Sequence, residues 1–98
     1  MHFFTLRLNE NINNSLDKIS KDTSISKSNL ILFALFTLTN KHDKFDYYYS
    51  SDNFIRTGIR LPIRLNKILD NKVSELATSK NLYINSLLRE FINSFEYI

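Results

Sequence analysis

The sequence of 98 residues lacks cysteine, which excludes disulfide bonds, thiolate metal sites and a cysteine nucleophile. It contains one glycine and one proline, so it has no glycine-rich phosphate loop and few sharp turns. The apolar run Leu30–Leu38 is interrupted by Thr37 and is too short to span a bilayer. The N-terminus lacks the basic region, apolar stretch and cleavage site of an export signal. These absences predict a mostly helical protein of the reducing cytoplasm with no membrane attachment.

Residue types with catalytic or metal-binding chemistry are sparse or badly spaced. The two histidines, His2 and His42, have no second ligand three or four residues away, and no serine lies in a nucleophile-elbow context. We therefore expect no catalysis, no metal or other cofactor, and no small-molecule ligand. The net charge of +3 is mildly basic, which is compatible with nucleic-acid binding but does not by itself indicate it.

The most informative feature that is present is an internal repeat. The segment Phe4–Asn9 (FTLRLN) is similar to the segment Leu61–Asn66 (LPIRLN), 57 residues later. In both segments, apolar residues that point inward alternate with residues that point outward, as in a half-buried strand. Both segments end at an asparagine that suits a helix N-cap. One strand alone cannot satisfy its backbone, whereas two such strands can pair as an antiparallel ribbon.

Two helix-period patterns follow each strand. In the first half, Ile12, Leu16 and Ile19 predict a helix over about residues 10–21. Ser26 suits the N-cap of a longer and strongly apolar helix over 27–40. At the interval of 57, the apolar residues of the second half fall on apolar residues of the first, without a gap: Leu69, Val73, Leu76, Leu82, Leu87, Leu88, Phe91, Ile92 and Phe95.

A second alignment of the two halves is open. It ends the second strand at residues 59–62 and begins the following helix at Ile63. We rank it below the interval of 57, because it places Lys72 at the position of Ile19 and lengthens the helix by a turn.

The order of strand, short helix, tight turn and longer helix, with these two strand motifs, resembles the ribbon-helix-helix (Arc/MetJ-like) DNA-binding family over about residues 3–40 and 60–96. Members are ordinarily homodimers in which each subunit gives one strand to a ribbon that enters the DNA major groove. The resemblance implies a mainly α fold with a two-stranded antiparallel β-ribbon, built as a tandem ribbon-helix-helix that forms a single-chain pseudo-dimer. The implied organisation is a first unit at 1–41, a linker at 42–59 and a second unit at 60–98, with one shared core.

The resemblance also implies which residues contact DNA bases. The family's base-reading strand positions fall on Phe3, Thr5 and Arg7 in the first copy and on Arg60, Pro62 and Arg64 in the second. We expect Arg7 and Arg64 to be the main readers, because an arginine can donate two hydrogen bonds to guanine. Phe3 and Pro62 cannot hydrogen-bond a base through their side chains, so the two strands should read unevenly. The alternative is that both arginines are solvated charges that discourage unwanted strand pairing.

In the same family, the N-terminus of the longer helix offers backbone N–H groups to a DNA phosphate. The matching residues are Ser26, Lys27 and Ser28 in the first copy, and Tyr83 and Asn85 in the second. The second set contains no serine or threonine cap, so its phosphate contact is expected to use the tyrosine hydroxyl, the asparagine and backbone amides. Ordinary helix capping accounts for the same residues equally well.

The predicted linker is long enough to join the two units. The eighteen residues from His42 to Ile59 can extend to about 60 Å. Tyr47–Tyr49 could stack on bases or meet a partner, and our interpretation is that they cover the shared core.

The function implied is sequence-specific binding of double-stranded DNA by a small transcriptional repressor of the nucleoid, with further copies of the protein gathering on DNA. A plasmid partition or relaxosome accessory protein would use the same contacts. An alternative of another class is a helical protein-interaction module that does not bind DNA, which the modest charge and the aromatic linker favour.

Overall fold

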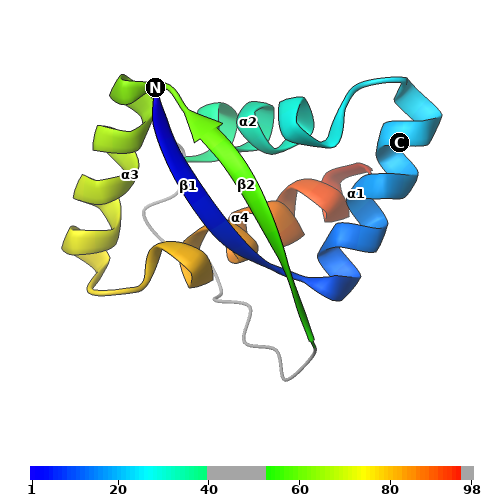
Figure 1. The fold of residues 1–98 in the computed structure, drawn as a ribbon. Coiled ribbons are helices and arrows are strands. Elements are labelled where there is room, and N and C mark those ends of the chain that lie inside the picture. Colours follow the sequence, from blue (N-terminus) through cyan, green and yellow to red (C-terminus); the bar gives the residue numbers. More distant parts are fainter. Residues whose placement is uncertain (40–52, 96–98) are drawn as a thin grey trace.

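The computed structural model describes residues 1–39 and 53–95. In chain order these residues form β1 (His2–Asn9), α1 (Glu10–Thr23), α2 (Lys27–Leu38), β2 (Phe54–Leu61), α3 (Ile63–Leu76) and α4 (Lys80–Phe95). Figure 1 shows the two strands side by side, with the helices around and behind them. The described part is thus mainly helical with one two-stranded antiparallel sheet, which confirms the expected fold class at that level.

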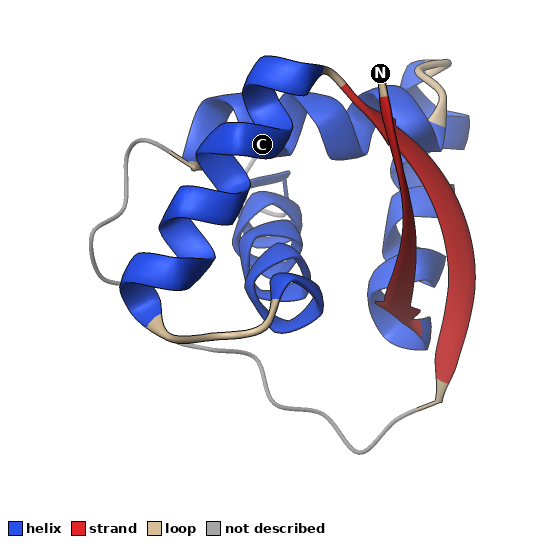
Figure 2. Ribbon diagram, turned by 60° about the vertical axis from the view of Figure 1, so that its left-hand side comes forward, coloured by secondary structure: helices blue, strands red, loops and turns tan. Residues whose placement is uncertain are grey.

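The two strands form a ribbon and pair along their whole length. His2 lies opposite Leu61 and Asn9 lies opposite Phe54, so β2 ends where β1 begins. Successive side chains of a strand point to opposite faces of the sheet. The inward side chains of Leu6 and Leu8 are fully buried, whereas those of Thr5 and Arg7 are exposed. Figure 2 shows the ribbon as a curved layer at one side of the molecule, with helices on its inner side only.

The helices of the first half start where the sequence predicts. Asn9 caps α1 by accepting a hydrogen bond from the Ile12 N–H (3.1 Å), and Ser26 caps α2 by accepting one from the Asn29 N–H (3.2 Å). Between the two helices, Ser24 adopts a left-handed conformation with φ of 61°, which ends α1. The two predicted helices of this half are therefore confirmed, with ends that differ by two residues from those expected.

The second half follows the alternative alignment, and the interval of 57 is wrong. The strand occupies residues 54–61, so the segment 61–66 is not a strand and Asn66 lies inside α3. Pro62 stands between β2 and α3, where its fixed φ and missing N–H end the strand. β2 also occupies residues 54–59, which the sequence pattern assigns to the linker.

At an interval of 53, local features of the two halves coincide. Ser79 accepts a hydrogen bond from the Leu82 N–H (3.1 Å) at the start of α4, as Ser26 does in α2. Ala77 ends α3 with φ of 54°, as Ser24 ends α1. The identical pairs at this interval are Arg7/Arg60, Leu8/Leu61, Asn13/Asn66, Leu16/Leu69, Asp17/Asp70, Ser26/Ser79, Lys27/Lys80, Ile31/Ile84, Leu35/Leu88 and Asn40/Asn93.

A small polar cluster ties the two helices of each half together. Lys27 Nζ donates a hydrogen bond to Asn13 Oδ1 (2.7 Å) and forms an ion pair with Asp17 (3.3 Å). These contacts fix the first turn of α2 against α1. The same arrangement recurs 53 residues later among Asn66, Asp70 and Lys80.

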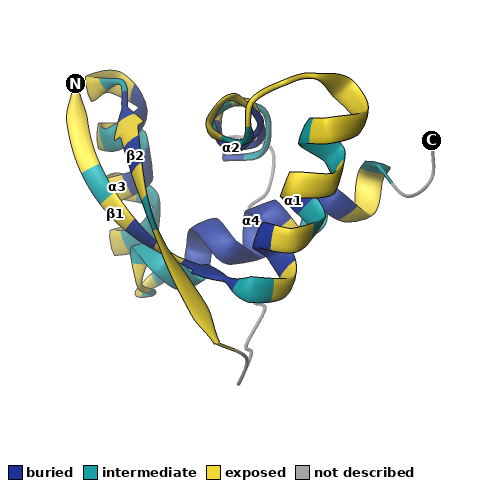
Figure 3. Cartoon of the chain, turned by 45° about the vertical axis from the view of Figure 1, so that its right-hand side comes forward, coloured by how far each residue is buried: buried dark blue, intermediate teal, exposed yellow. Residues whose placement is uncertain are grey.

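One buried cluster draws on both halves of the chain. It contains the inward residues of both strands and apolar residues from all four helices. α4 contributes most, and Tyr83, Ile84, Leu87 and Leu88 are fully buried. Figure 3 shows buried residues over much of α4, while the strands are exposed on their outer side. The helices thus pack against one face of the ribbon, and no other described element covers its second face.

His42 and Tyr47–Tyr49 lie outside the described residues. The expectation that these tyrosines cover the core therefore stays a prediction.

Candidate functional site

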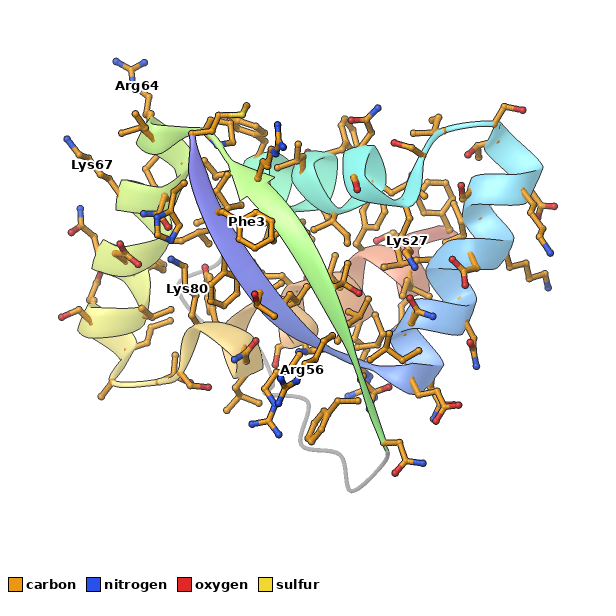
Figure 4. All side chains as sticks on the ribbon, in the orientation of Figure 1. Phe3, Lys27, Arg56, Arg64, Lys67 and Lys80 are labelled. Atoms are coloured by element: carbon orange, nitrogen blue, oxygen red, sulfur yellow. The ribbon has the colours of Figure 1, made fainter. Side chains whose placement is uncertain are left out.

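The outer side of the ribbon carries three residues from each strand. They form three cross-strand pairs, and all six residues are exposed: Phe3 with Arg60, Thr5 with Gly58, and Arg7 with Arg56. We call this surface the outward ribbon face. It presents three guanidinium groups, one hydroxyl and one aromatic ring, which are side chains that can bind a polyanion and discriminate between bases. Figure 4 shows Phe3 lying on the ribbon and Arg56 farther along it.

Most of the predicted base contacts lie on this face. Phe3, Thr5, Arg7 and Arg60 belong to it. Pro62 and Arg64 do not, because β2 ends at Leu61. Arg64 lies in the first turn of α3, so its predicted place on the ribbon is wrong.

The strand motif chosen from the sequence misses Arg56 and Gly58. A signal for both residues exists in the alternation over residues 54–61, where Arg56, Gly58 and Arg60 are exposed and the residues that follow them, Thr57, Ile59 and Leu61, are half-buried or buried. The identities at the interval of 53 give the same result, since they align Arg60, and not Arg64, with Arg7 in the sequence repeat.

Arg7 and Arg56 form a cross-strand pair of like charge. The Arg7 N–H donates to Asn81 Oδ1 (2.9 Å), and the Arg7 carbonyl accepts from Asn85 Nδ2 (3.0 Å). Because both backbone groups of Arg7 face α4, the pair with Arg56 is not hydrogen-bonded through the backbone, and in such pairs the side chains lie closer together. Like charges directly opposite each other destabilise a sheet.

No carboxylate relieves this repulsion within residues 1–39 and 53–95. The Arg7 guanidinium instead lies over the ring of Phe54, with 4.6 Å between Cζ and the ring centroid. A cation–π contact leaves the positive charge in place. The pair therefore keeps two neighbouring positive charges that an anionic ligand would neutralise.

The edge of β1 that does not pair with β2 forms hydrogen bonds to two side-chain amides, which lie one turn apart on α4. Asn81 accepts the hydrogen bond from the Arg7 N–H, and Asn85 accepts one from the Asn9 N–H (2.9 Å). Asn85 is buried and also donates to the Arg7 carbonyl. These bonds satisfy backbone groups that an edge strand otherwise leaves unpaired, and they hold the backbone at Arg7 in place.

The first predicted phosphate site has the expected local structure. Ser26 caps α2 and Lys27 lies in its first turn, while Ser28 is exposed beside them. Part of the lysine charge is already used by Asp17 and Asn13. A phosphate contact at this helix end stays a prediction.

The second predicted phosphate site is wrong in its position. α4 begins at Lys80, so Tyr83 and Asn85 lie one turn inside the helix and are buried. Tyr83 is part of the core, and Asn85 holds β1. At the interval of 53, the counterparts of the first site are Ser79, Lys80 and Asn81.

A separate basic area flanks one end of the ribbon. Arg64 and Lys67 lie on the first two turns of α3 and are exposed. Since α3 follows Leu61, which pairs with His2, this area adjoins the end where β1 begins. Figure 4 shows both side chains projecting away from the body of the protein. The corresponding residues of α1 are the uncharged Asn11 and Asn14, so α1 does not repeat this basic area.

Searches against family models, curated proteins and solved structures yield no match to this chain. Within the described ranges, no three histidine or acidic residues gather as a metal ligand set would require. None of the described helices is both long and apolar enough to cross a membrane.

Proposed function

We propose that the protein binds double-stranded DNA by placing the outward ribbon face in the major groove, as a tandem ribbon-helix-helix protein in which one chain supplies both strands. A two-stranded ribbon fits the width of the major groove. The observation that carries the proposal is the set of three arginines on this face, two of which are cross-strand neighbours without an acidic partner in the described chain. The simplest biological role is repression by occupying an operator. Plasmid maintenance would use the same contacts.

The two ends of the ribbon differ, and this difference supports an asymmetric target. One end carries Arg7 and Arg56, and the other carries Phe3 and Arg60. Arginine donates well to guanine O6 and N7, so we expect guanines under three of these four positions. A perfect palindrome is not required, because the two half-sites meet different side chains.

The test is alanine substitution of each ribbon arginine, with binding measured by fluorescence anisotropy on a duplex selected from a random-sequence library. Arg7→Ala, Arg56→Ala and Arg60→Ala should each weaken binding to the selected duplex by about 1–3 kcal/mol and relax the base preference at a different position. The matched control is Lys21→Ala, which removes an exposed positive charge from the last turn of α1. If all three arginine variants bind and discriminate like the Lys21 variant, the ribbon does not read DNA.

Arg64 and Lys67 should act differently, as contacts to the phosphate backbone beside one half-site. Replacing both with alanine should lower the slope of log K against log salt by about 2, because each neutralised phosphate contributes about 0.9. The base preference should stay the same, since phosphate contacts carry no sequence information. Titrations at several salt concentrations on the selected and a scrambled duplex measure both quantities. A change in base preference would show that α3 reaches the bases.

A protein-interaction module is the second candidate, and one observation favours it. Phe33 and Phe36 on α2 are 61% and 55% exposed, and such side chains are enriched at protein interfaces. Phe33 also meets the ring of Phe91 edge-on, with 6.0 Å between centroids. Intact DNA binding with Phe33→Ser and Phe36→Ser would separate this surface from the ribbon.

A further inference from the structure

Phe3 and Gly58 are fitted to each other across the ribbon. A Cβ atom added to Gly58 would lie 2.6 Å from Cζ of Phe3 and 3.0 Å from its Cε2, so any larger residue at this position would displace the Phe3 ring. The backbone itself does not require glycine, because Gly58 does not have a positive φ. The only glycine of the sequence therefore makes room for the ring.

The ring is held on the outer face and is not buried there. Phe3 is 62% exposed although one part of it covers Gly58. An aromatic ring over a strand glycine stabilises a sheet, and this contact alone would account for the pair. The contact with Gly58 does not involve the exposed part of the ring. This part lies on a surface whose other side chains are arginines and a threonine.

The position of the ring within the repeat is also informative. At the interval of 53, Arg7 corresponds to Arg60 and Phe3 corresponds to Arg56. Three of these four equivalent places thus hold an arginine, and the fourth holds a flat apolar ring. The end of the ribbon with Phe3 and Arg60 has one hydrogen-bonding side chain and one apolar surface where the other end has two guanidinium groups.

We propose that Phe3, supported by Gly58, recognises the 5-methyl group of a pyrimidine in the half-site that Arg60 contacts. This inference rests on the proposed function. The methyl group is the apolar feature of the major-groove edge of a base pair, and an apolar side chain such as phenylalanine is a suitable contact for it. Thymine and 5-methylcytosine both carry this group. A ring that is fixed against the backbone meets the methyl group with little loss of conformational entropy.

The first experiment removes the methyl group and nothing else. Each thymine of a duplex selected by the wild-type protein is replaced in turn by uracil, and the dissociation constant is measured. Replacement at one or two adjacent positions should weaken binding about four-fold, the ratio expected when one buried carbon group worth about 0.8 kcal/mol is lost. Replacement elsewhere should have no effect. Cytosine and 5-methylcytosine at the sensitive position, each opposite guanine, then show whether the methylated base is also accepted.

The second experiment assigns the methyl contact to Phe3. In Phe3→Ala, thymine and uracil at the sensitive position should bind equally, whereas Thr5→Ala should keep the four-fold difference. Gly58→Ala should also reduce the difference, because the added Cβ displaces the ring. Circular dichroism and thermal unfolding of each variant test whether the fold is retained, and Phe3→Leu provides a smaller apolar group that should keep part of the difference.

The outcomes separate this inference from the proposed function. A selected duplex that is insensitive to uracil at every thymine, or a difference that survives in Phe3→Ala, overturns the role of Phe3 while DNA binding stands. Loss of the difference in Thr5→Ala alone assigns the methyl contact to Thr5 and also overturns it. If the wild-type protein selects no sequence from the library, the proposed function fails and the inference fails with it.

Discussion

Replacing Asn85 with leucine should lower the free energy of unfolding by about 2–6 kcal/mol, since each buried polar group left without a partner costs about 1–3 kcal/mol. The substitution leaves the Asn9 N–H and the Arg7 carbonyl without a hydrogen-bond partner, because both bond to the Asn85 amide. Urea denaturation followed by circular dichroism measures the change. The backbone at Arg7 also loses its support, so binding at the Arg7 half-site should weaken more than binding at the Arg60 half-site.

Two matched variants make this result specific. Asn81→Ala removes a single bond to the Arg7 N–H at an exposed position, where water can replace the amide, and should cost much less. Asn85→Asp keeps an acceptor for the Asn9 N–H but has no donor for the Arg7 carbonyl, and should fall between the two. If Asn85→Leu is no more harmful than Asn81→Ala, the edge of β1 does not depend on Asn85.

Tyr83→Ala should destabilise the protein by about 3–5 kcal/mol, the range found when a large buried aromatic side chain is truncated. Tyr83 is fully buried, and its hydroxyl lies 3.5 Å from the Thr39 carbonyl. Because one kcal/mol shifts the melting temperature of a domain of this size by about 4–8 °C, thermal unfolding should show a large effect. Tyr83→Phe, which keeps the ring, should cost about 0.5–1.5 kcal/mol at most.

The Tyr83→Phe variant also decides between the two roles considered for this residue. A phosphate contact through the hydroxyl would weaken DNA binding in Tyr83→Phe with little change in stability. The buried position predicts the opposite pattern, with affinity unchanged. A loss of affinity in a stable Tyr83→Phe protein would contradict the structure at this site.

The first half of the fold could be read from the sequence because its local signals agree. Asn9 and Ser26 are strong N-cap residues, and Asn9 is followed by an apolar pattern with helical period whereas Ser26 is followed by a strongly apolar stretch. The strand before them alternates cleanly between buried and exposed positions. Every signal points to the same boundaries, so the correct assignment needed no tertiary information.

The second half cannot be assigned in the same way, because two local signals conflict: the strand motif at 61–66 and the alternation over residues 54–61. The motif 61–66 reproduces the sequence of the first strand, yet it lies across the boundary between β2 and α3. The aligned apolar residues did not reveal the error, because leucine and isoleucine are frequent enough to match at either interval. The polar residues that do discriminate, Asn66, Asp70 and Lys80, act through contacts between helices. Such contacts become visible as a set only when the fold is known.

The same shift explains the errors at the candidate site. Moving the strand by four residues replaces Arg64 with Arg60 as the counterpart of Arg7 and brings Arg56 and Gly58 onto the outward ribbon face. It also moves the N-cap of the last helix from Tyr83 to Ser79, so that α4 begins at Lys80. The close fit of Phe3 on Gly58 depends on the cross-strand register, which no pattern within one strand contains.

Both strands of the ribbon belong to one polypeptide, and this changes how many positions of the ribbon one mutation alters. In a ribbon formed by two identical chains, one codon change alters two symmetric positions, and both halves of the target must adapt to it together. Here a codon change alters one position of the ribbon, so if the ribbon binds DNA as proposed, one half of the target can change while the other half is still bound. Under the proposed function, a lineage that carries such a gene would change its binding site by single steps, each of which preserves part of the affinity.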